Sequence, residues 1–290
     1  MRLTFIDPCL PSLTDDPPAG EDWIHEVKHD GYRTILIIEG AHVRAFTRNG
    51  HDWSHRYRTF CSEARSLSCR STILDGEMVV LDSRGASDFR ALPGAIAHAQ
   101  HKLTLVAFDI LYLDGKDLRD APLIDRRARL EELVDKGGSC IQFSESFTGD
   151  SDAFLRAVDR MGLEGIVSKK AGSRYRSGRS KTWLKTKCWT EDEFDIIATA
   201  KTPKGLPVAL LAREGAYVGE AIISLPAKTR SSFNACVERL VTETPSLNGF
   251  RKRDIRWVRS GLRARARYLR GEEFLRHATM TGFRLANERR

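Results

Sequence analysis

Several common features are missing from this 290-residue chain, and each absence narrows the class of protein. No apolar run is long enough to cross a bilayer. The first residues, Met1 to Leu13, are interrupted by Asp7 and by prolines, so they lack the apolar middle of a secretory signal. The six cysteines include no Cys-x-x-Cys pair, which argues against a zinc ribbon and a disulfide framework. We therefore expect a cytoplasmic protein with reduced thiols and no membrane partner.

The positive charge is concentrated toward the C-terminal end. The net charge is +8, and residues 189–290 carry 19 Lys and Arg against 12 Asp and Glu, a net of +7, which leaves 28 against 27 for residues 1–188. Such a cationic region favours phosphate backbones as partners, with a merely solvated basic surface as the alternative. The length suits two domains, and the acidic stretch Thr190–Glu193 suggests a hinge. We predict domains at residues 1–188 and 189–290.

Hydrophobic patterning predicts a first domain rich in strands. An irregular lead-in occupies Pro8–Gly20, and the three arginines of the helix after Pro122, namely Arg126, Arg127 and Arg129, are expected to face solvent. The predicted strands are Trp23–Val27, Thr34–Ile38, Val43–Thr47, Ser71–Leu81 and Leu103–Leu113, and the predicted helices are Ser54–Leu67, Pro122–Val134 and Asp152–Met161.

The pattern of the second domain predicts several short strands and one helix, which is typical of an OB-type barrel. Its predicted strands are Phe194–Thr199, Val208–Arg213, Ala216–Ile223 and Leu262–Leu269, with a helix at Ser231–Val241. In the last strand, strict alternation places Arg263, Arg265 and Arg267 on one face, where we expect them to contact the phosphates of a nucleic acid.

Charged residues at strand ends and inside apolar runs mark a candidate site. Lys28 follows a strand and precedes the Asp30-Gly31 turn, where a ligand can reach it. Glu77 interrupts an apolar run, and a buried carboxylate there needs a positive partner such as a metal ion or, alternatively, a buried arginine. Lys185 and Lys187 project to one face of a strand, so they either share an anion such as phosphate or line a wet surface.

The order of the motifs resembles that of the ATP-dependent DNA ligases, within the covalent nucleotidyltransferases, and in particular the ligase modules of bacterial non-homologous end-joining enzymes. The motifs are Lys28-x-Asp-Gly, Arg48-Asn-Gly, Asp-Gly-Glu77, Phe108-Asp, Glu164-Gly-x-Val and Lys185-x-Lys187. The resemblance implies an α+β fold, in which an adenylation domain of packed antiparallel sheets with flanking helices precedes an OB-fold barrel that binds DNA.

The resemblance also implies residue roles, with ATP and Mg²⁺ or Mn²⁺ as cofactors. Lys28 would take AMP as a phosphoramidate, and nearby cations would favour loss of its proton. The other roles are adenine recognition by Glu26 and the backbone at Val27, base stacking by Phe108, contacts to ribose and phosphates by Arg33 and Arg48, metal association by Glu77 and Glu164, and contacts to the α-phosphate and leaving group by Lys169, Lys185 and Lys187.

We predict from this resemblance a monomeric ATP-dependent ligase that seals 5′-phosphate/3′-hydroxyl breaks in nicked or broken duplex DNA, near the nucleoid, in repair or end joining. A Ku-type protein and a separate polymerase or nuclease are expected partners. An RNA ligase or a capping-type guanylyltransferase shares the lysine motif and is one alternative.

The C-terminal end departs from the ligase pattern. The family's Arg-x-Asp-Lys motif is reduced here to Arg284, which is followed by Leu285, Ala286 and Asn287, with Arg289 as a candidate substitute. A catalytically impaired DNA-end-binding relative is therefore the other alternative.

Overall fold

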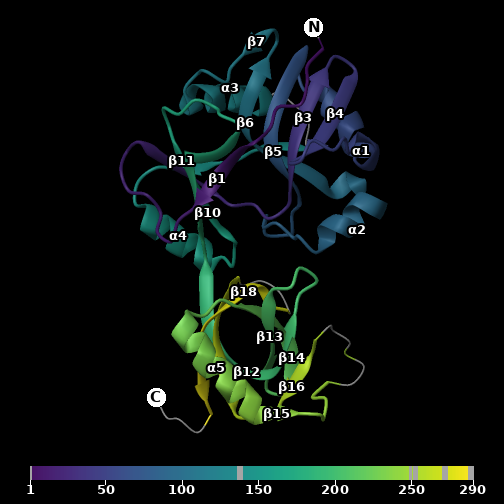
Figure 1. The fold of residues 1–290 in the computed structure, drawn as a ribbon. Coiled ribbons are helices and arrows are strands. Elements are labelled where there is room, and N and C mark those ends of the chain that lie inside the picture. The colour runs from purple at the N-terminus through teal and green to yellow at the C-terminus, as the bar shows by residue number, and fades with distance from the viewer. Residues whose placement is uncertain (1, 136–139, 248–249, 251–253, 270–273, 287–290) are drawn as a thin grey trace. The chain divides into compact units, whose positions relative to one another are not determined.

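The computed structural model describes residues 2–135, 140–247, 250, 254–269 and 274–286 (Figure 1). The chain divides into two compact units, residues 1–187 and 188–290. Within the described ranges, no helix is both long and apolar enough to span a membrane.

The first unit contains two β-sheets. The order in the larger sheet is β4, β3, β5, β6 and β7, with β8 beside β6. Its strands are β3 (Tyr32–Glu39), β4 (His42–Thr47), β5 (Ser71–Val80), β6 (Leu103–Leu113), β7 (Lys116–Asp117) and β8 (Ile141–Phe143). The order in the smaller sheet is β1, β11, β10, β2 and β9. Its strands are β1 (Cys9–Leu13), β2 (Trp23–Val27), β9 (Ser146–Phe147), β10 (Gly165–Lys170) and β11 (Gly178–Lys187).

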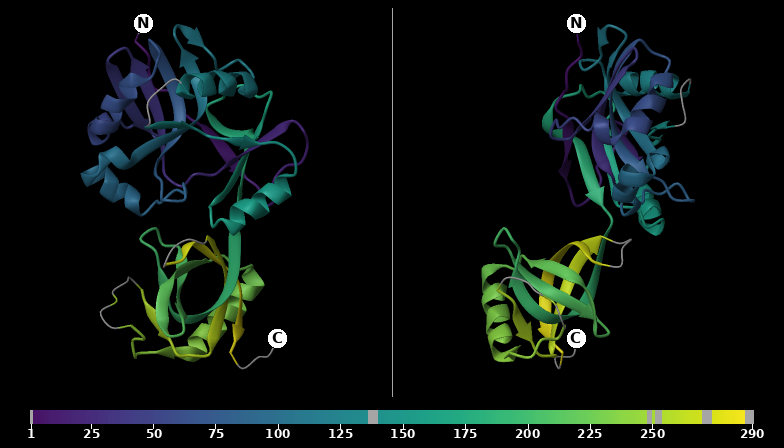
Figure 2. Two further views of the ribbon diagram at one scale, coloured as in Figure 1. Left: turned by 180° about the vertical axis from the view of Figure 1, so that it is seen from behind. Right: turned by 90° about the vertical axis from the view of Figure 1, so that its right-hand side faces the viewer.

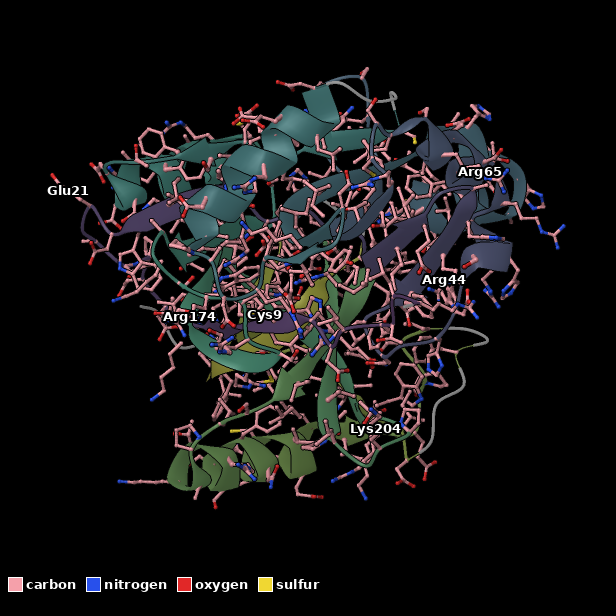
Figure 3. All side chains as sticks on the ribbon, turned by 90° about the horizontal axis from the view of Figure 1, so that it is seen from above. Cys9, Glu21, Arg44, Arg65, Arg174 and Lys204 are labelled. Atoms are coloured by element: carbon pink, nitrogen blue, oxygen red, sulfur yellow. The ribbon has the colours of Figure 1, made fainter. Side chains whose placement is uncertain are left out.

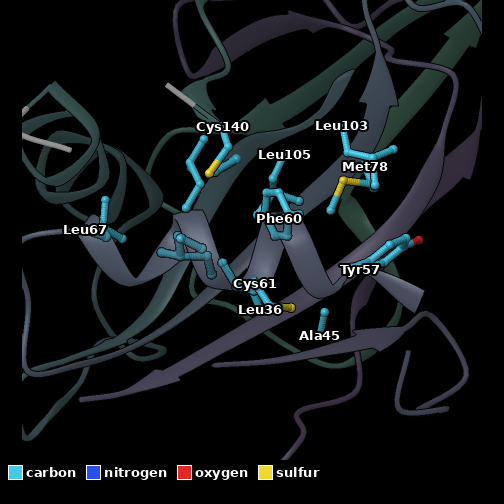
Figure 4. Packing of buried hydrophobic residues seen from close by; sticks show 14 of the residues in the cluster. Leu36, Ala45, Tyr57, Phe60, Cys61, Leu67, Met78, Leu103, Leu105 and Cys140 are labelled. Atoms are coloured by element: carbon cyan, nitrogen blue, oxygen red, sulfur yellow. The ribbon is translucent and has the colours of Figure 1, made fainter. Parts of the chain in front are cut away.

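The larger sheet is buried on both faces, which explains its uninterrupted apolar runs. Leu36 and Ile38 of β3 face a core shared with helices, whereas Ile35 and Ile37 face a core shared with the smaller sheet. Figure 4 shows Phe60 of α1 among Leu36 and Leu105 of the larger sheet. The helical elements of this unit are α1 (Arg58–Glu63), α2 (Ala91–His98), α3 (Leu123–Asp135) and α4 (Ser151–Arg160), with 3₁₀ turns at Ser54–Arg56, Ala64–Ser66 and Gln100–Lys102.

The second unit is a closed five-stranded barrel. Strands β12 and β13 pair with each other, and the ring continues through β14, β18 and β17 back to β12. Figures 1 and 2 show this ring with α5 along it. Its elements are β12 (Trp189–Lys201), β13 (Pro207–Arg213), β14 (Ala216–Ile223), α5 (Ala227–Leu240), β15 (Val241–Thr242), β16 (Arg256–Val258), β17 (Leu262–Leu269) and β18 (Arg276–Leu285). A helix between the third and fourth strands of such a ring is the OB arrangement, so the predicted α+β class with an OB barrel is confirmed.

The structure corrects three sequence-based expectations. The lead-in contains β1, an edge strand that tolerates Pro11 because its pairing with β11 shifts register between Pro11 and Ser12. The predicted helix at Ser54–Leu67 is one short α-helix between two 3₁₀ turns. The acidic stretch from Thr190 to Glu193 is no irregular hinge, because it belongs to β12 and pairs residue by residue with β17.

The arginines of α3 are the fourth correction. Arg126 and Arg127 are 0% and 3% exposed, although the helix pattern predicts that they face solvent. Both guanidinium groups are held by buried carboxylates: Arg126 donates to both oxygens of Asp109 at 2.7 Å, and Arg127 donates to Glu26 at 2.9 Å. Figure 3 shows, by contrast, Glu21 and Arg65 at the periphery of the side chains, where they are exposed.

Candidate active site

A cavity of about 220 Å³ lies where the two sheets of the first unit face each other. The smaller sheet contributes residues from four of its strands, and the larger sheet contributes one residue each from β3, β5 and β6. The lining residues are Leu10, Pro11, Glu26, Val27, Lys28, His29, Arg33, Arg48, Glu77, Phe108, Val167, Lys169, Arg179, Trp183 and Lys185. Most residues predicted from the motifs therefore meet at one cavity, although the strands that carry them are far apart in sequence.

Lys28 stands at the end of β2, as its place in the sequence predicts. Its backbone N–H donates to the carbonyl of Gly165 at 2.8 Å, which continues the pairing of β2 with β10 and holds this lysine at the cavity wall. Its side chain is 21% exposed, and its ammonium group donates to Glu164. A ligand that enters the cavity can thus reach this amine.

Glu164 joins two of the lysines. Lys28 contacts one carboxylate oxygen, and the ammonium of Lys187 lies 3.0 Å from the other. Burial would by itself raise the pKa of Glu164, but these two cations lower it below its ordinary value. Lys185 lies in the same cluster, and burial together with the charges of Lys28 and Lys187 lowers its pKa. Glu164 therefore remains ionised amid an excess of positive charge.

Glu77 has charged neighbours but no such direct partner among the described residues. This carboxylate accepts no hydrogen bond and forms no ion pair within the part of the chain that the structure describes. Burial raises the pKa of Glu77 to about 7, although Arg33 and Lys28 oppose the effect. Among the described residues, no group of three or more His, Cys, Asp or Glu side chains forms a dense metal cage. A carboxylate without a direct ion-pair partner fits a magnesium ion, which usually keeps several of its waters.

Two aromatic rings form one wall of the cavity, and cations cover them. Phe108 meets Trp183 edge to face, with ring centroids 6.0 Å apart. The ammonium of Lys169 lies 4.3 Å from both ring centroids, and the guanidinium of Arg33 lies 4.5 Å from that of Phe108. An aromatic wall beside clustered cations suits a nucleotide, whose base and phosphates match these two kinds of group.

Glu26 lines the cavity and is also engaged by three protein side chains. Its Oε1 atom lies 2.6 Å from the ammonium of Lys169 and 2.9 Å from Arg127, and its Oε2 atom accepts from Ser144 at 2.8 Å. Burial lowers the pKa of Lys169 to about 8, whereas Glu26 raises it in part. The structure thus shows Glu26 as the anchor of Lys169 and Arg127, with both carboxylate oxygens already engaged.

Arg33 is also held in place, by two residues to which the motifs assign no role. Asp75 accepts from its guanidinium at 2.5 and 2.7 Å, and Tyr175 donates to Asp75 at 2.6 Å. The phenol oxygen of Tyr175 accepts in turn from the backbone of Cys9 at 2.9 Å. The signal for Asp75 was present, because it interrupts the same apolar run as Glu77. The sequence assigned no role to Tyr175.

The remaining predicted residues lie at the edge of this site or outside the first unit. Arg48 lines the cavity from the turn after β4. In the barrel, burial alternates along β17 so that Ala264 and Ala266 face inward while Arg263, Arg265 and Arg267 point outward, as predicted. Arg284 lies on the neighbouring strand β18. Asn287 and Arg289 lie outside the described residues.

His29 lines the same cavity and was not predicted as a site residue. Burial lowers its pKa from the ordinary 6.5 to about 4, and the charge of Lys28 adds to the effect while Glu26 opposes it. The unfolded chain therefore binds this proton at a higher pH than the folded chain does. We expect the free energy of unfolding to fall as the pH drops from 6.5 to 4.

Urea unfolding at a series of pH values measures this effect. His29→Gln should flatten the acid side of the stability profile, whereas the exposed His42→Gln should not. Equal profiles for the two variants would show that His29 does not cause the acid destabilisation.

Comparisons with known proteins agree with this geometry. A family model for the ATP-dependent DNA ligase domain matches residues 16–187. The chain is 43% identical over 203 residues to the multifunctional non-homologous end joining protein LigD of Pseudomonas aeruginosa, a match that covers 69% of this chain and 24% of that protein. It is 30% identical over 219 residues to the SPbeta prophage-derived DNA ligase-like protein LigB of Bacillus subtilis, which covers 74% of this chain and 78% of the relative.

A solved structure extends the likeness to the second unit. Mycobacterial DNA ligase D complexed with ATP and MES is similar with a TM-score of 0.60 and 27% identity, over 97% of this chain and 95% of that chain. The fold and cavity define a nucleotidyltransferase domain followed by an OB domain. The chain belongs to the ATP-dependent DNA ligase family, as its motifs predict. It spans about a quarter of the length of the LigD relative from Pseudomonas aeruginosa.

Proposed function

We propose that this chain seals 5′-phosphate/3′-hydroxyl breaks in duplex DNA at the expense of ATP, through a lysyl-AMP intermediate on Lys28. The observation that carries the proposal is the position of this one amine, at a strand end inside a cavity that combines an aromatic wall with clustered cations. Family membership and the structural match to a ligase bound to ATP support it.

The first step forms a P–N bond between Lys28 and the α-phosphorus of ATP, while the bond to pyrophosphate breaks and the lysine loses its proton. In this proposal Lys185, which lines the cavity, and Lys187, which pairs with Glu164, stabilise negative charge on the phosphates. Phe108 offers a face for the base, and Arg33 and Lys169 hold that ring in position from their own carboxylate anchors. In the second step AMP passes to the 5′-phosphate of the break, and in the third the 3′-hydroxyl displaces AMP.

Magnesium or manganese fits Glu77 and Glu164. A divalent ion there would supply charge stabilisation at the phosphates, in the manner usual for metal-assisted phosphoryl transfer. The fit depends on Glu77, whose half-buried carboxylate has no direct ion-pair partner among the described side chains, and on its neighbour Glu164, which is held ionised.

Glu77→Gln tests this assignment. We expect it to slow adenylylation at limiting magnesium by at least about tenfold, because the charge stabilisation by a metal ion is worth several kcal/mol. Glu131→Gln on the exposed face of α3 changes the net charge equally and should have no effect. The rate of label transfer from ATP as magnesium is titrated is the measurement. An unaltered magnesium dependence in Glu77→Gln would remove this residue from the metal site.

Sealing of a nicked duplex with a labelled 5′-phosphate tests the function itself. ATP and magnesium should yield the joined strand, and GTP should not label the protein. Label from GTP would favour the capping-type alternative, and sealing of nicked RNA but not DNA would favour an RNA ligase.

A DNA-end-binding relative with an impaired first step is a second candidate, and one observation favours it. Arg284, the remaining residue of the expected Arg-x-Asp-Lys motif, donates to Glu193 at 2.7 Å within its own unit. Duplex binding without any covalent nucleotide would identify this alternative.

The setting of the reaction is also part of the proposal. LigD relatives are named for non-homologous end joining, so we propose action at double-strand ends in repair, as a monomer near the nucleoid. A Ku-type end-binding protein and separate polymerase or nuclease activities are the proposed partners. The division of labour between residues 1–188 for adenylation and residues 189–290 for DNA binding belongs to the same proposal.

A further inference from the structure

The outward face of the barrel carries a ladder of opposite charges. Across the β12–β17 pairing, Glu191 is the Cα partner of Arg267, Glu193 of Arg265, and Asp195 of Arg263. Strand β18 lies on the other side of β17 and places Arg284 opposite Arg263. We define the acidic row as Glu191, Glu193 and Asp195. The stretch that suggests a hinge in the sequence is therefore the neighbour of the arginines that suggest a DNA contact.

Glu193 is the centre of this ladder. Arg284 donates to both of its carboxylate oxygens, at 3.0 and 2.7 Å, which is the bidentate geometry of a strong pair. The Nη1 atom of Arg263 lies 3.6 Å from Glu193, and its Nε atom lies 3.4 Å from Asp195. These groups are only partly buried, with 20% of the Glu193 side chain and 27% of the Arg284 side chain exposed, so a polyanion can reach them.

From these contacts we propose that the acidic row competes with DNA phosphates for the arginines, and so limits the affinity of the barrel for duplex DNA. The inference rests on the proposed function, in which this unit binds DNA. A phosphate that engages Arg284 or Arg263 must displace a carboxylate that already neutralises it. An arginine neutralised in this way also releases fewer counterions on binding, which lowers the salt dependence of the affinity.

Such a competition has a functional consequence for a ligase. A protein that binds intact duplex tightly is sequestered by the large excess of unbroken DNA. If the phosphate contacts of the barrel are weak, the protein is not held on intact duplex. Its choice of binding site then depends on the break and on the adenylylated first unit. Strands β12, β17 and β18 therefore carry both the arginines that would contact DNA and the carboxylates that would limit this contact.

Glu193→Gln tests the proposal in the full chain, since the amide keeps the size of the side chain and removes its charge. Fluorescence anisotropy with an intact duplex should show severalfold tighter binding, and the slope of log K against log salt should steepen by about 0.9 for one released arginine. Glu243→Gln changes the net charge equally at an exposed position of the same unit and is the matched control. Asp195→Asn, which removes a carboxylate beside Arg263, should act in the same direction.

Several results decide between this proposal and its failure. Equal gains for Glu193→Gln and Glu243→Gln would show an effect of net charge alone and overturn the proposal. Adding Arg284→Ala to Glu193→Gln should remove much of the gain in duplex affinity. If the double variant keeps the full gain, Arg284 is not the cation that Glu193→Gln releases. Thermal unfolding of each variant separates these effects from loss of fold. If the parent protein binds no duplex at any salt concentration, the proposed function itself is contradicted, and the inference that rests on it falls with it.

Discussion

Lys28→Ala should abolish the covalent nucleotide. After incubation with ATP and magnesium, intact-mass measurement is expected to show one added adenylyl group on the parent protein and none on the variant. Sealing of a nicked duplex should fall by on the order of 10³-fold or more, as when a nucleophile is removed. The physical reason is that the aromatic wall and the cations still bind the nucleotide, but no amine stands at the strand end to form the P–N bond.

Two controls make this result specific. Lys116→Ala removes an exposed lysine of β7, far along the chain from the motif, and should leave adduct formation unchanged. A nick that already carries AMP on its 5′-phosphate bypasses the first step, so Lys28→Ala should still seal it and thereby prove that it is folded. An adduct that persists in Lys28→Ala would assign the nucleophile to another residue.

Arg126→Met should cause the largest loss of stability. Arg126 and Asp109 are both 0% exposed and are joined by two hydrogen bonds of 2.7 Å. Removal of one partner leaves an uncompensated buried charge, which typically costs about 3–5 kcal/mol. Burial already raises the pKa of Asp109, with Arg126 opposing it, so the loss in the variant should grow as the pH rises and the carboxylate ionises.

Urea unfolding of the full chain measures this loss. Arg119→Met breaks the ion pair with Asp117, whose partners are 43% and 51% exposed, and should cost about 0–1 kcal/mol. The double change Arg126→Met with Asp109→Leu removes both charges and should recover part of the stability. If Arg126→Met cost no more than the exposed control, the buried pair would not be a determinant of the fold.

These two positions show what the sequence could and could not predict. Lys28 was recognisable because strand alternation ends at Val27 and a turn signal follows, and both are local properties. Arg126 was misplaced because its helix reads as amphipathic with a cationic face. Arg126 can be buried because its guanidinium pairs with Asp109. This carboxylate lies on β6 and contributes nothing to the local pattern of the helix.

The site shows the same division. The ordered motifs predicted most of the side chains that line the cavity, including Glu77 and Phe108, and Glu164, which contacts Lys28 of its wall. They did not predict that Glu26 anchors Lys169 and Arg127, or that Tyr175 and Asp75 hold Arg33. These supporting contacts join elements separated by tens of residues. A motif gives the residue types at its own positions but not the distant partners that they contact.

Most of the long strands, the family and most residue types of the cavity were determined by the sequence alone, because periodicity and short motifs are properties of neighbouring residues. Only the tertiary structure decided which charged side chains form pairs with each other. Glu77 has no direct ion-pair partner among the described residues, whereas Glu164 has two lysines, and the arginines of β17 and β18 lie beside an acidic strand. The physical reason is that the energy of a charged group depends on its partner and its burial, which folding sets by bringing distant strands into register.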